Sequence, residues 1–324
     1  MNTRILKINR WNPEPDIVSY AADSLRRGRT VVFPTETVYG LGANGLDAEA
    51  VKKIFQAKKR PADNPLILHL SAPEDALRLA SVDERARAVM EAFWPGPLTL
   101  VLPALPVVPP EVRGGLETVA LRMPDHPVAL ALIGRAGFPV AAPSANRSGR
   151  PSPTDASAAI ADLDGEVDVV LDAGEVDVGL ESTVVDLTEK VPLLLRPGGF
   201  FVEKLTDFLG EKLGEARELA ARRSPGTRYR HYAPAIPVRI WRGEDLSGQS
   251  GLGESGFMGL SAPSAAFAKR ILFDTKENYA RGVFAGFRAM ESWGVRSIVV
   301  EWPDDAGIGL ALQDRIRRAS DCRS

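Results

Sequence analysis

The sequence predicts an α/β protein in which a twisted mixed sheet with flanking helices is followed by a smaller α/β domain. The chain has 324 residues, which is enough for about two domains. Near the N-terminus, strand-like apolar runs alternate with helix-like segments, a pattern typical of α/β folds. Several later strand-like runs follow one another without room for a helix between them. This arrangement favours antiparallel pairs within the same sheet.

The first predicted elements are two helices, each next to a strand. Apolar residues at helical spacing fill 17–25, with Asp16 as the expected N-cap and Gly28 at the expected C-terminal end. Asp47 is expected to cap a second helix in the same way. We expect strands at 30–34 and 66–70, on either side of that second helix.

Six further strand-like runs fill the rest of the first domain: LTLVLP, TVALRMP, PVAAPSAN, VDVVLDAG, STVVDL and PLLLRPG. Residues 210–235 then combine proline, glycine and cations among aromatic residues, which is typical of an interdomain linker. Further strand-like runs, a helix at 277–293 and a final amphipathic helix predict a second α/β domain. The expected domains are therefore 1–209 and 236–324, joined by the linker 210–235.

Composition weighs against several classes of function. The formal net charge is −2, from 40 Lys plus Arg against 42 Asp plus Glu, so global charge does not indicate nucleic-acid binding. The one cysteine, Cys322, argues against disulfides, a thiolate metal site and a cysteine nucleophile. The three histidines lack the spacing of a metal site. With no signal-peptide pattern and no apolar run of membrane length, we expect a cytoplasmic protein without a membrane association.

The strongest functional signal is a pair of segments, PTETVYGLG at 34–42 and KKRPADNPLILHL at 58–70. Together they indicate a pocket for a phosphate-bearing ligand and a small polar partner. The glycines at 40, 42 and 45 match the dinucleotide pattern G-x-G-x-x-G. However, the link from the strand is longer than a phosphate turn, and the next strand ends without an acidic residue, so a dinucleotide site is disfavoured. The sequence also has no Walker motif, which disfavours a Walker-type ATPase.

Single residues in these segments have an ordinary structural interpretation beside the functional one. Thr35 and Thr37 suit the end of a strand, or they project into a pocket. The cations at 58–60 suit the C-terminus of a helix, where such side chains usually face water. Pro61 follows at once, stops the helix and fixes the direction of the cations, which favours the functional interpretation.

Other strand-like runs also end in hydroxyl, amide or guanidinium groups. Arg122 lies in phase with Thr118 on its strand, so both face the same side. The segment SANRSGRPSP at 144–153 offers neutral donors suited to anionic oxygens. Ser182 starts one strand and Arg196 ends another. In an α/β sheet such strand ends tend to converge on one crevice, where we expect the ligand site.

These motifs, taken together, resemble the L-threonylcarbamoyladenylate synthases, the YrdC-like family, in its longer two-domain form. PTETVYGLG, KKRPADNPL with His69, SANRSGRPSPT, ESTVVD, LLLRPG and SPGTRYRHYAP occur in the order of the family. The resemblance covers nearly the whole chain. It implies a YrdC-like mixed sheet and a Rossmann-like C-terminal accessory domain, which resembles the family most clearly at 307–316.

The resemblance implies a nucleotidyltransferase that combines L-threonine, bicarbonate or CO2, and ATP. Its products would be threonylcarbamoyl-AMP and pyrophosphate, and a partner transferase would use the first to modify a tRNA adenosine. Mg²⁺ would arrive with ATP, without a metal site made of side chains. The chemistry of the residues fits independently, because a guanidinium such as that of Arg122 binds a carboxylate well. The reaction needs no covalent enzyme nucleophile, so catalysis would rest on positioning and charge stabilisation.

Family knowledge also implies a role for individual residues. The residues expected around L-threonine are Thr37, His69, Arg122, Ala142 and Ser182. The residues expected around ATP are Arg60, Asn64, Thr118, Ser144, Asn146, Ser152, Arg196 and Tyr232. Lys58 and Arg60 are expected to act catalytically through their charge. In the linker, Thr227 stands where the family pattern has Met, whereas Tyr229, His231 and Tyr232 remain, so we expect the linker to close over the nucleotide.

Two alternatives stay open at the level of sequence. The first is a double-stranded-RNA or tRNA-binding protein without synthase activity, which would use the cations at 58–60 together with Arg222, Arg223, Arg228 and Arg230. The net charge weighs against it. The second is a carbamoyl-transfer module like those fused into hydrogenase-maturation proteins, which the absence of zinc-finger cysteines disfavours.

Overall fold

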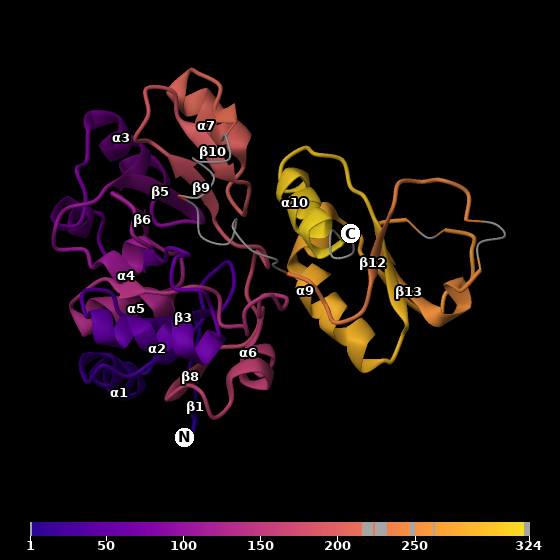
Figure 1. Ribbon diagram of the computed structural model, residues 1–324, viewed down its shortest axis with the longest axis horizontal. Helices are drawn as coiled ribbons and strands as arrows, with labels where there is room; N and C mark the ends of the chain where they lie inside the picture. Colours follow the sequence, from indigo (N-terminus) through magenta and orange to yellow (C-terminus); the bar gives the residue numbers. More distant parts are fainter. Residues whose placement is uncertain (1, 216–222, 224–231, 247–249, 262, 321–324) are drawn as a thin grey trace.

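The structure, a computed structural model, describes residues 2–215, 223, 232–246, 250–261 and 263–320. These residues form two α/β domains that lie side by side (Figure 1). The first domain is built on an 11-stranded sheet with the strand order β1-β8-β2-β3-β7-β4-β6-β5-β9-β10-β11. The second is built on a 4-stranded sheet with the order β12-β15-β13-β14. The predicted fold class, a mixed sheet followed by a smaller α/β domain, is confirmed.

The elements of the first domain alternate irregularly between strand and helix. Its strands are β1 (Arg4–Lys7), β2 (Val31–Phe33), β3 (Gly40–Asn44), β4 (Ile67–His69), β5 (Leu98–Pro103), β6 (Thr118–Arg122), β7 (Val140–Ala141), β8 (Val169–Asp172), β9 (Thr183–Asp186), β10 (Leu193–Arg196) and β11 (Gly214–Glu215). Its helices are α1 (Pro15–Arg26), α2 (Ala48–Lys58), the 3-10 helix η1 (Pro73–Arg78), α3 (Glu84–Phe93), α4 (Pro110–Arg113), α5 (Pro127–Ala136), α6 (Ala156–Leu163) and α7 (Val202–Leu209). Among these residues every helix is too short or too polar to cross a bilayer, and the same holds for the described helices of the second domain.

The large sheet is mixed because it contains both parallel and antiparallel pairs of strands. β4 pairs with β6 in parallel and with β7 in antiparallel fashion. β5 in turn pairs with β6 in antiparallel fashion and with β9 in parallel. β11 adds to the edge of this sheet beside β10, so the first domain includes residues that we assigned to the linker.

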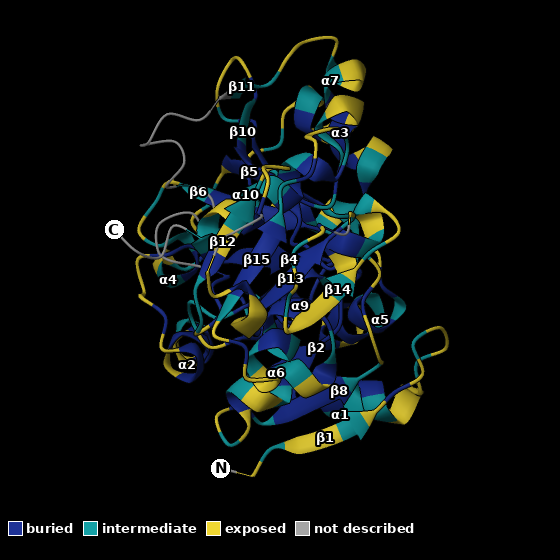
Figure 2. Cartoon of the chain, turned by 90° about the vertical axis from the view of Figure 1, so that its right-hand side faces the viewer, coloured by how far each residue is buried: buried dark blue, intermediate teal, exposed yellow. Residues whose placement is uncertain are grey.

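The sheet is apolar on both faces because helices cover each of them. In β2, Val31 and Phe33 pack into one core together with α1 and α5, whereas Val32 packs into another core together with α2. This alternation follows from the pleat, which turns successive side chains to opposite faces. The central strands are accordingly buried along their length (Figure 2).

Of two predicted helix caps one is confirmed and one is wrong, and one strand was missed. Asp47 caps α2 as predicted, since its side chain accepts hydrogen bonds from the backbone N–H groups of Glu49 and Ala50. The expectation for Asp16 is wrong: α1 begins at Pro15 after Glu14, and Asp16 lies in the first turn, where a carboxylate still suits the helix dipole. The strand β3 was not predicted, because its glycines were interpreted as part of a ligand loop.

The second domain is a parallel sheet with two long helices. Its strands are β12 (Val238–Trp241), β13 (Ser255–Gly259), β14 (Lys269–Leu272) and β15 (Ser297–Glu301), and every pairing among them is parallel. The 3-10 helix η2 spans Leu252–Glu254, and the long helices are α9 (Lys276–Ser292) and α10 (Gly309–Ser320). Strand β14 was not predicted from the sequence, whereas α9 matches the expected helix within one residue at each end.

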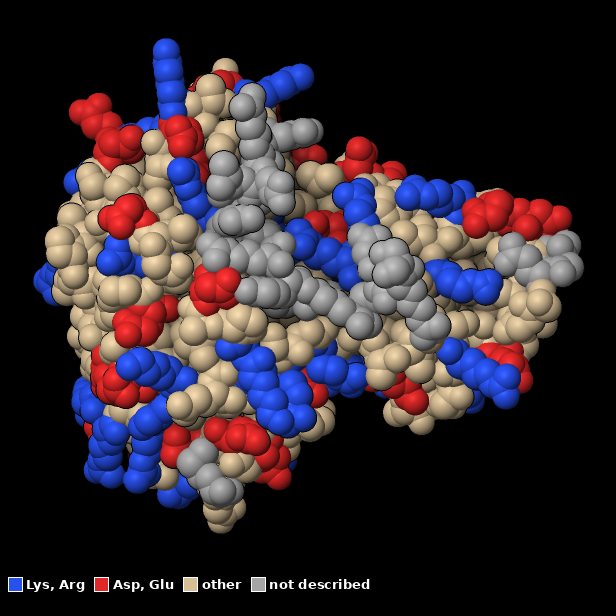
Figure 3. Space-filling view, in the orientation of Figure 1, with Lys and Arg blue, Asp and Glu red and all other residues tan. Residues whose placement is uncertain are grey.

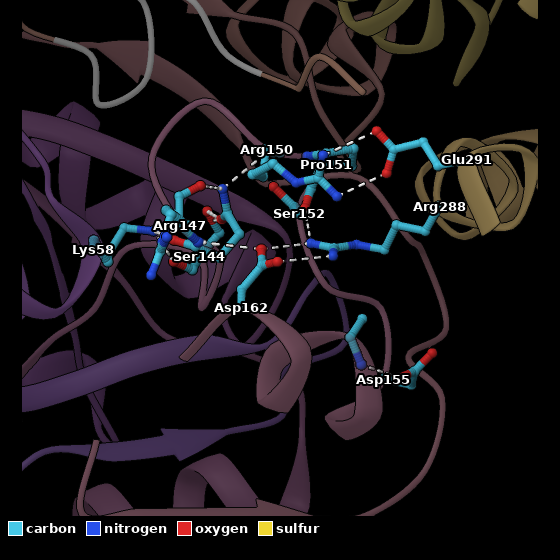
Figure 4. Close-up of polar contacts among 12 residues, drawn as sticks. Lys58, Ser144, Arg147, Arg150, Pro151, Ser152, Asp155, Asp162, Arg288 and Glu291 are labelled. Atoms are coloured by element: carbon cyan, nitrogen blue, oxygen red, sulfur yellow. Dashed lines mark hydrogen bonds and ion pairs between the residues drawn. The ribbon is translucent and has the colours of Figure 1, made fainter. Parts of the chain in front are cut away.

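The two domains are packed tightly against each other. Leu180 of the first domain is buried in the apolar core of the second. Beside it, the backbone of Gly179 approaches α9 so closely that an added Cβ would lie 2.3 Å from Cα of Arg281. Two ion pairs extend the contact: Arg288 binds Asp162 at 2.8 Å, and Arg150 binds Glu291 through both terminal guanidinium nitrogens (Figure 4).

The closeness of the two backbones makes Gly179 a test of domain docking. Gly179 and Gly174 both have a positive φ, of 79° and 82°, but only Gly174 has open space around it. Replacing Gly174 with alanine should cost about 1 kcal/mol of unfolding free energy, the penalty for that backbone conformation. Replacing Gly179 should cost roughly 2 kcal/mol more, because the new Cβ clashes with α9. Urea unfolding of both variants measures the difference, and equal losses would show that the contact contributes nothing.

Candidate functional site

One cavity in the first domain collects most of the residues singled out in the sequence. It lies beside the ends of β4 and β6 and is lined by Thr35, Thr37, Val38, Gly40, Arg60, Ile67, His69, Arg122, Ala142, Pro143, Ser144, Glu181, Ser182, Arg196 and Tyr232. Segments far apart in the sequence therefore meet at one place. This is the crevice expected from strands that end in polar residues.

Strand pairing explains why these segments converge. In the parallel pair of β4 and β6, His69 lies opposite Arg122, so both side chains reach the same end of the sheet. An isolated antiparallel bridge joins Gly40 to Ser144 and brings the loop after β7 next to β3. Ala142, the residue after β7, is held by a hydrogen bond from its N–H to the carbonyl of Ile67.

A buried ion pair sets the position of Arg122. One of its terminal nitrogens, Nη2, lies 2.7 Å from a carboxylate oxygen of Glu36, and both side chains are almost completely buried. Its Nε donates a hydrogen bond of 3.3 Å to the carbonyl of Gly96. Among the described residues, neither Nη2 nor the Glu36 oxygens have a partner aligned for a hydrogen bond. Nη2 is therefore ion-paired with Glu36 but makes no aligned hydrogen bond, so the guanidinium is suited to donate to an anion that enters the cavity.

His69 is an uncharged group in this site. Burial, together with the nearby charge of Arg122, lowers its pKa to about 3. The imidazole is therefore neutral throughout the physiological range and offers a hydrogen-bonding group without a charge.

Hydroxyl groups line the cavity between the charged residues. The hydroxyls of Thr35 and Thr37 lie 2.8 Å apart, and the Thr35 hydroxyl also donates to the carbonyl of Val38 at 2.7 Å. Elsewhere in the cavity lining, Arg196 donates to the carbonyl and the hydroxyl of Ser182, at 2.9 Å and 3.2 Å. Thr37 and Ser182 are thus held in place by neighbours while they face the cavity.

Lys58 lies behind the cavity and does not line it. Its ammonium group donates to the carbonyl oxygens of Ser144 (2.5 Å) and Asn146 (Figure 4). The Asn146 side chain in turn donates to the carbonyls of Arg147 and Arg150, at 2.9 Å and 2.8 Å. Burial, followed by the charge of nearby Arg60, lowers the pKa of Lys58 well below its usual value. In this structure Lys58 holds the loop from 144 to 150, so its effect on a ligand would pass through that loop.

Of the other residues expected around ATP, some line the cavity and some do not. Arg60 lines the cavity, and its guanidinium also donates to the carbonyl of Pro65 at 3.2 Å. Asn64, Asn146 and Ser152 are buried outside the cavity wall, and Thr118 lies at the far end of β6, four residues before Arg122. Their proposed contacts with ATP stay predictions. In the linker, Thr227, Tyr229 and His231 lie outside the described residues, whereas Tyr232 is described and lines the cavity.

Sequence reasoning missed Glu181 as a residue of the site. It lines the cavity as the first residue of the ESTVVD motif, of which only the serine was singled out. Its position next to Ser182 is the signal that would have found it. The apolar wall formed by Val38, Ile67 and Pro143 was also not predicted, because such residues carry no chemical signature.

Comparison with known proteins assigns the chain to a family. The Sua5/YciO/YrdC family model, described as telomere recombination, matches residues 23–198, and a model described as threonylcarbamoyl-AMP synthase, C-terminal domain, matches residues 201–321. The chain belongs to the Sua5 family. Within it, the chain is 44% identical to the threonylcarbamoyl-AMP synthase of Pyrococcus abyssi, over 98% of this chain and 96% of that protein. The Bacillus subtilis protein of the same name is 40% identical, over 94% and 92% of the two chains.

Solved structures show that the Sua5 likeness extends to both domains. The structure of P. abyssi Sua5 complexed with L-threonine has a TM-score of 0.91 and 42% identity, and it covers 98% of this chain and 97% of that chain. E. coli YciO has a TM-score of 0.57 and 26% identity, and it covers 61% of this chain and 96% of that chain. The Sua5 family thus combines a YrdC-like domain with a second domain, as the sequence predicted.

The position of Lys58 can be tested by removing its ammonium group. Lys58→Met should lower the unfolding free energy by about 2 kcal/mol, because two buried carbonyl groups lose their donor. The matched control is Lys52→Met on the same helix, where the exposed lysine pairs with Glu49 and its loss should cost under about 0.5 kcal/mol. Urea unfolding measures both. A Lys58 variant as stable as the control would contradict a structural role for its contacts.

Proposed function

We propose that this protein is a threonylcarbamoyl-AMP synthase that combines L-threonine, bicarbonate or CO2, and ATP, with release of pyrophosphate. The observation that carries the proposal is the cavity wall formed by Arg122, neutral His69 and the flanking hydroxyls. Both domains match the Sua5 family, and a Sua5 structure contains L-threonine. In enzyme classification the activity is that of a nucleotidyltransferase.

The threonine subsite is the part of the cavity next to Arg122. A carboxylate there would receive charge-assisted hydrogen bonds from the guanidinium, including from Nη2, which is ion-paired with Glu36 but makes no aligned hydrogen bond. Thr37, His69 and Ser182 offer uncharged groups for the hydroxyl and amine of threonine. Because His69 carries no charge, it does not repel the ammonium group of incoming threonine in the way that an imidazolium would.

The ATP subsite is the part of the cavity next to Arg60, Arg196 and Ser144. Two guanidinium groups and a hydroxyl suit phosphate oxygens. Their role in catalysis would be to stabilise negative charge as it builds up during phosphoryl chemistry, since they are already in place before the reaction. Lys58 would contribute by holding the loop that presents Ser144.

The proposed reaction proceeds without a covalent bond to the enzyme. The amine nitrogen of threonine attacks the carbon of CO2 and loses a proton, which gives a carbamate. A carbamate oxygen then attacks the α-phosphorus of ATP, and the bond from that phosphorus to the bridging oxygen of pyrophosphate breaks. The enzyme has to hold the reactants in line and stabilise charge, which is the work that the cavity groups can do.

Mg²⁺ would accompany ATP as part of the substrate. Among the described residues, no group of three or more His, Cys, Asp or Glu side chains is placed to hold a metal ion. Glu181, the one carboxylate among the described residues that line the cavity, is bound to Ser152 and Arg315. The donor set fits an ion held by phosphate oxygens and water, where it would neutralise phosphate charge.

A tRNA threonylcarbamoyl transferase would take up the product, and we expect the reaction to take place in the cytoplasm. The described residues do not favour the RNA-binding alternative. Lys58 and Arg60 are buried, and Arg223 pairs with Asp186 and Glu189, while Arg222, Arg228 and Arg230 lie outside the described residues. Acidic and basic groups also interleave on the face shown in Figure 3.

A pyrophosphate assay tests the proposed function directly. The protein should release pyrophosphate from ATP and Mg²⁺ only when both L-threonine and bicarbonate are present, because the carbamate forms before the attack on phosphorus. Omission of each component in turn is the control. Release that is independent of threonine or of bicarbonate, or no release at all, would contradict the proposal.

Replacement of Arg122 tests the assignment of the threonine subsite. Arg122→Ala should raise the KM for threonine about 100-fold, because the carboxylate of bound threonine loses its charged partner. The KM for ATP should change by no more than about threefold, since the phosphates are assigned to other cations. Steady-state kinetics with each substrate varied in turn provides both values. A comparable loss for the two substrates would contradict the assignment.

A further inference from the structure

A residue of the second domain reaches into the wall of the cavity. Arg315 lies on α10 and is completely buried, although most arginines stay partly exposed. Its Nε donates a hydrogen bond of 2.8 Å to one carboxylate oxygen of Glu181. The other Glu181 oxygen accepts a hydrogen bond from the hydroxyl of Ser152. The only carboxylate that lines the cavity among the described residues is therefore held from behind by the second domain.

The same guanidinium also supports the end of the linker. Nη1 of Arg315 donates to the carboxylate of the neighbouring Asp314 at 2.5 Å and to the carbonyl of Pro197 at 3.1 Å. The contact with Pro197 fixes the side chain to the first domain at a second point. Its central carbon lies 5.0 Å from the ring centre of Tyr232, which lines the cavity. The Tyr232 ring in turn stacks on Phe284 of α9 at 5.4 Å. Arg315 thus contacts two residues of the cavity wall, Glu181 and Tyr232.

Charge gives this arrangement a consequence for ligand binding. Burial alone would raise the pKa of Glu181, but the charges of Arg315 and Arg196 outweigh it and lower the pKa, so the carboxylate is ionised. An anion in the wall of a phosphate-binding cavity would repel the phosphates of ATP unless a fixed cation compensates it. Arg196 faces the cavity and is assigned to ATP, whereas Arg315 lies behind Glu181.

We propose that Arg315 is a positioning residue of the synthase site, contributed by the second domain, which compensates the charge of Glu181 and fixes Glu181 and Tyr232 so that the cavity accepts the polyphosphate of ATP. The inference rests on the proposed function in taking ATP as the ligand. It gives the second domain a direct part in substrate binding, beyond its attachment to the first domain.

Other contacts between the domains separate this role from domain docking. Arg281 of α9 donates to the carbonyl of Asp177 at 2.7 Å and does not line the cavity. Arg281→Met therefore removes an interdomain hydrogen bond without a change of charge at Glu181. It is the control for effects that come from docking alone.

The experiment is a double-mutant cycle on Arg315 and Glu181, with ATP affinity measured by calorimetry on the full chain. Arg315→Met should weaken ATP binding by about tenfold or more, because the buried carboxylate of Glu181 is left uncompensated beside the phosphates. Glu181→Gln in the Arg315→Met background should restore most of that loss, since the amide is neutral and keeps the shape of the side chain. Arg315→Lys should retain most of the affinity because it keeps the charge. Arg281→Met should bind ATP like the parent protein.

Several results would overturn the proposal. These are unchanged ATP affinity in Arg315→Met, no recovery in the double variant, or an equal loss in Arg281→Met. If Arg315→Met does not fold, the comparison of Glu181→Gln with the double variant decides. When residue 181 is neutral, removal of Arg315 should weaken ATP binding by no more than about threefold. A larger loss in the double variant than in Glu181→Gln would contradict charge compensation.

Failure of this inference is distinct from failure of the proposed function. A parent protein that releases pyrophosphate in the presence of threonine and bicarbonate, while Arg315 variants bind ATP normally, overturns only the role of Arg315. A parent protein that does not bind ATP overturns the proposed function itself.

Discussion

A guanidinium group leaves water only when other groups take over its hydrogen bonds and its charge, and this constraint determines the structure of the site. Arg122 meets it with Glu36 and the carbonyl of Gly96. Arg196 meets it with Ser182, and Arg315 with Glu181 and the carbonyl of Pro197. Each partner belongs to a different segment from the arginine that it binds, so the cavity exists only once those segments have been brought together.

Local pattern predicted the elements whose signals are local. The cap at Asp47 and the helix α9 follow from side chains a few residues apart, and the mixed sheet follows from strand-like runs without helices between them. Strand β3 was missed because Gly40 and Gly42 have low strand propensity. Gly42 is needed for packing, because a Cβ at this position would lie 2.8 Å from both Phe33 and Val140. Tertiary contacts, which the sequence pattern does not display, overrode propensity there.

At the site, too, residues with a local sequence signal were predicted, and residues placed by distant contacts were not. Thr37, His69, Arg122, Ser182 and Arg196 carry chemistry at strand ends, so their type and position together indicated a shared crevice. Glu181 and Arg315 lie 134 positions apart, and no pattern in either segment predicts that the two side chains pair. The direction of Lys58 was equally hidden, because a lysine at the end of a helix usually faces water. Here it turns inward to carbonyl groups of a distant loop, and only the folded arrangement shows this.

The strand order β1-β8-β2 has a consequence for the way in which the first domain reaches this structure. β8 lies between two strands that precede it by more than a hundred positions, at Arg4–Lys7 and Val31–Phe33. Until β8 is in place, β2 has an open edge, which in a partly folded chain invites wrong pairing. Closing so long a loop is slow relative to local pairing. We therefore expect the end of the large sheet around β8 to form late in folding, and the edge of β2 to stay open to wrong pairing until then.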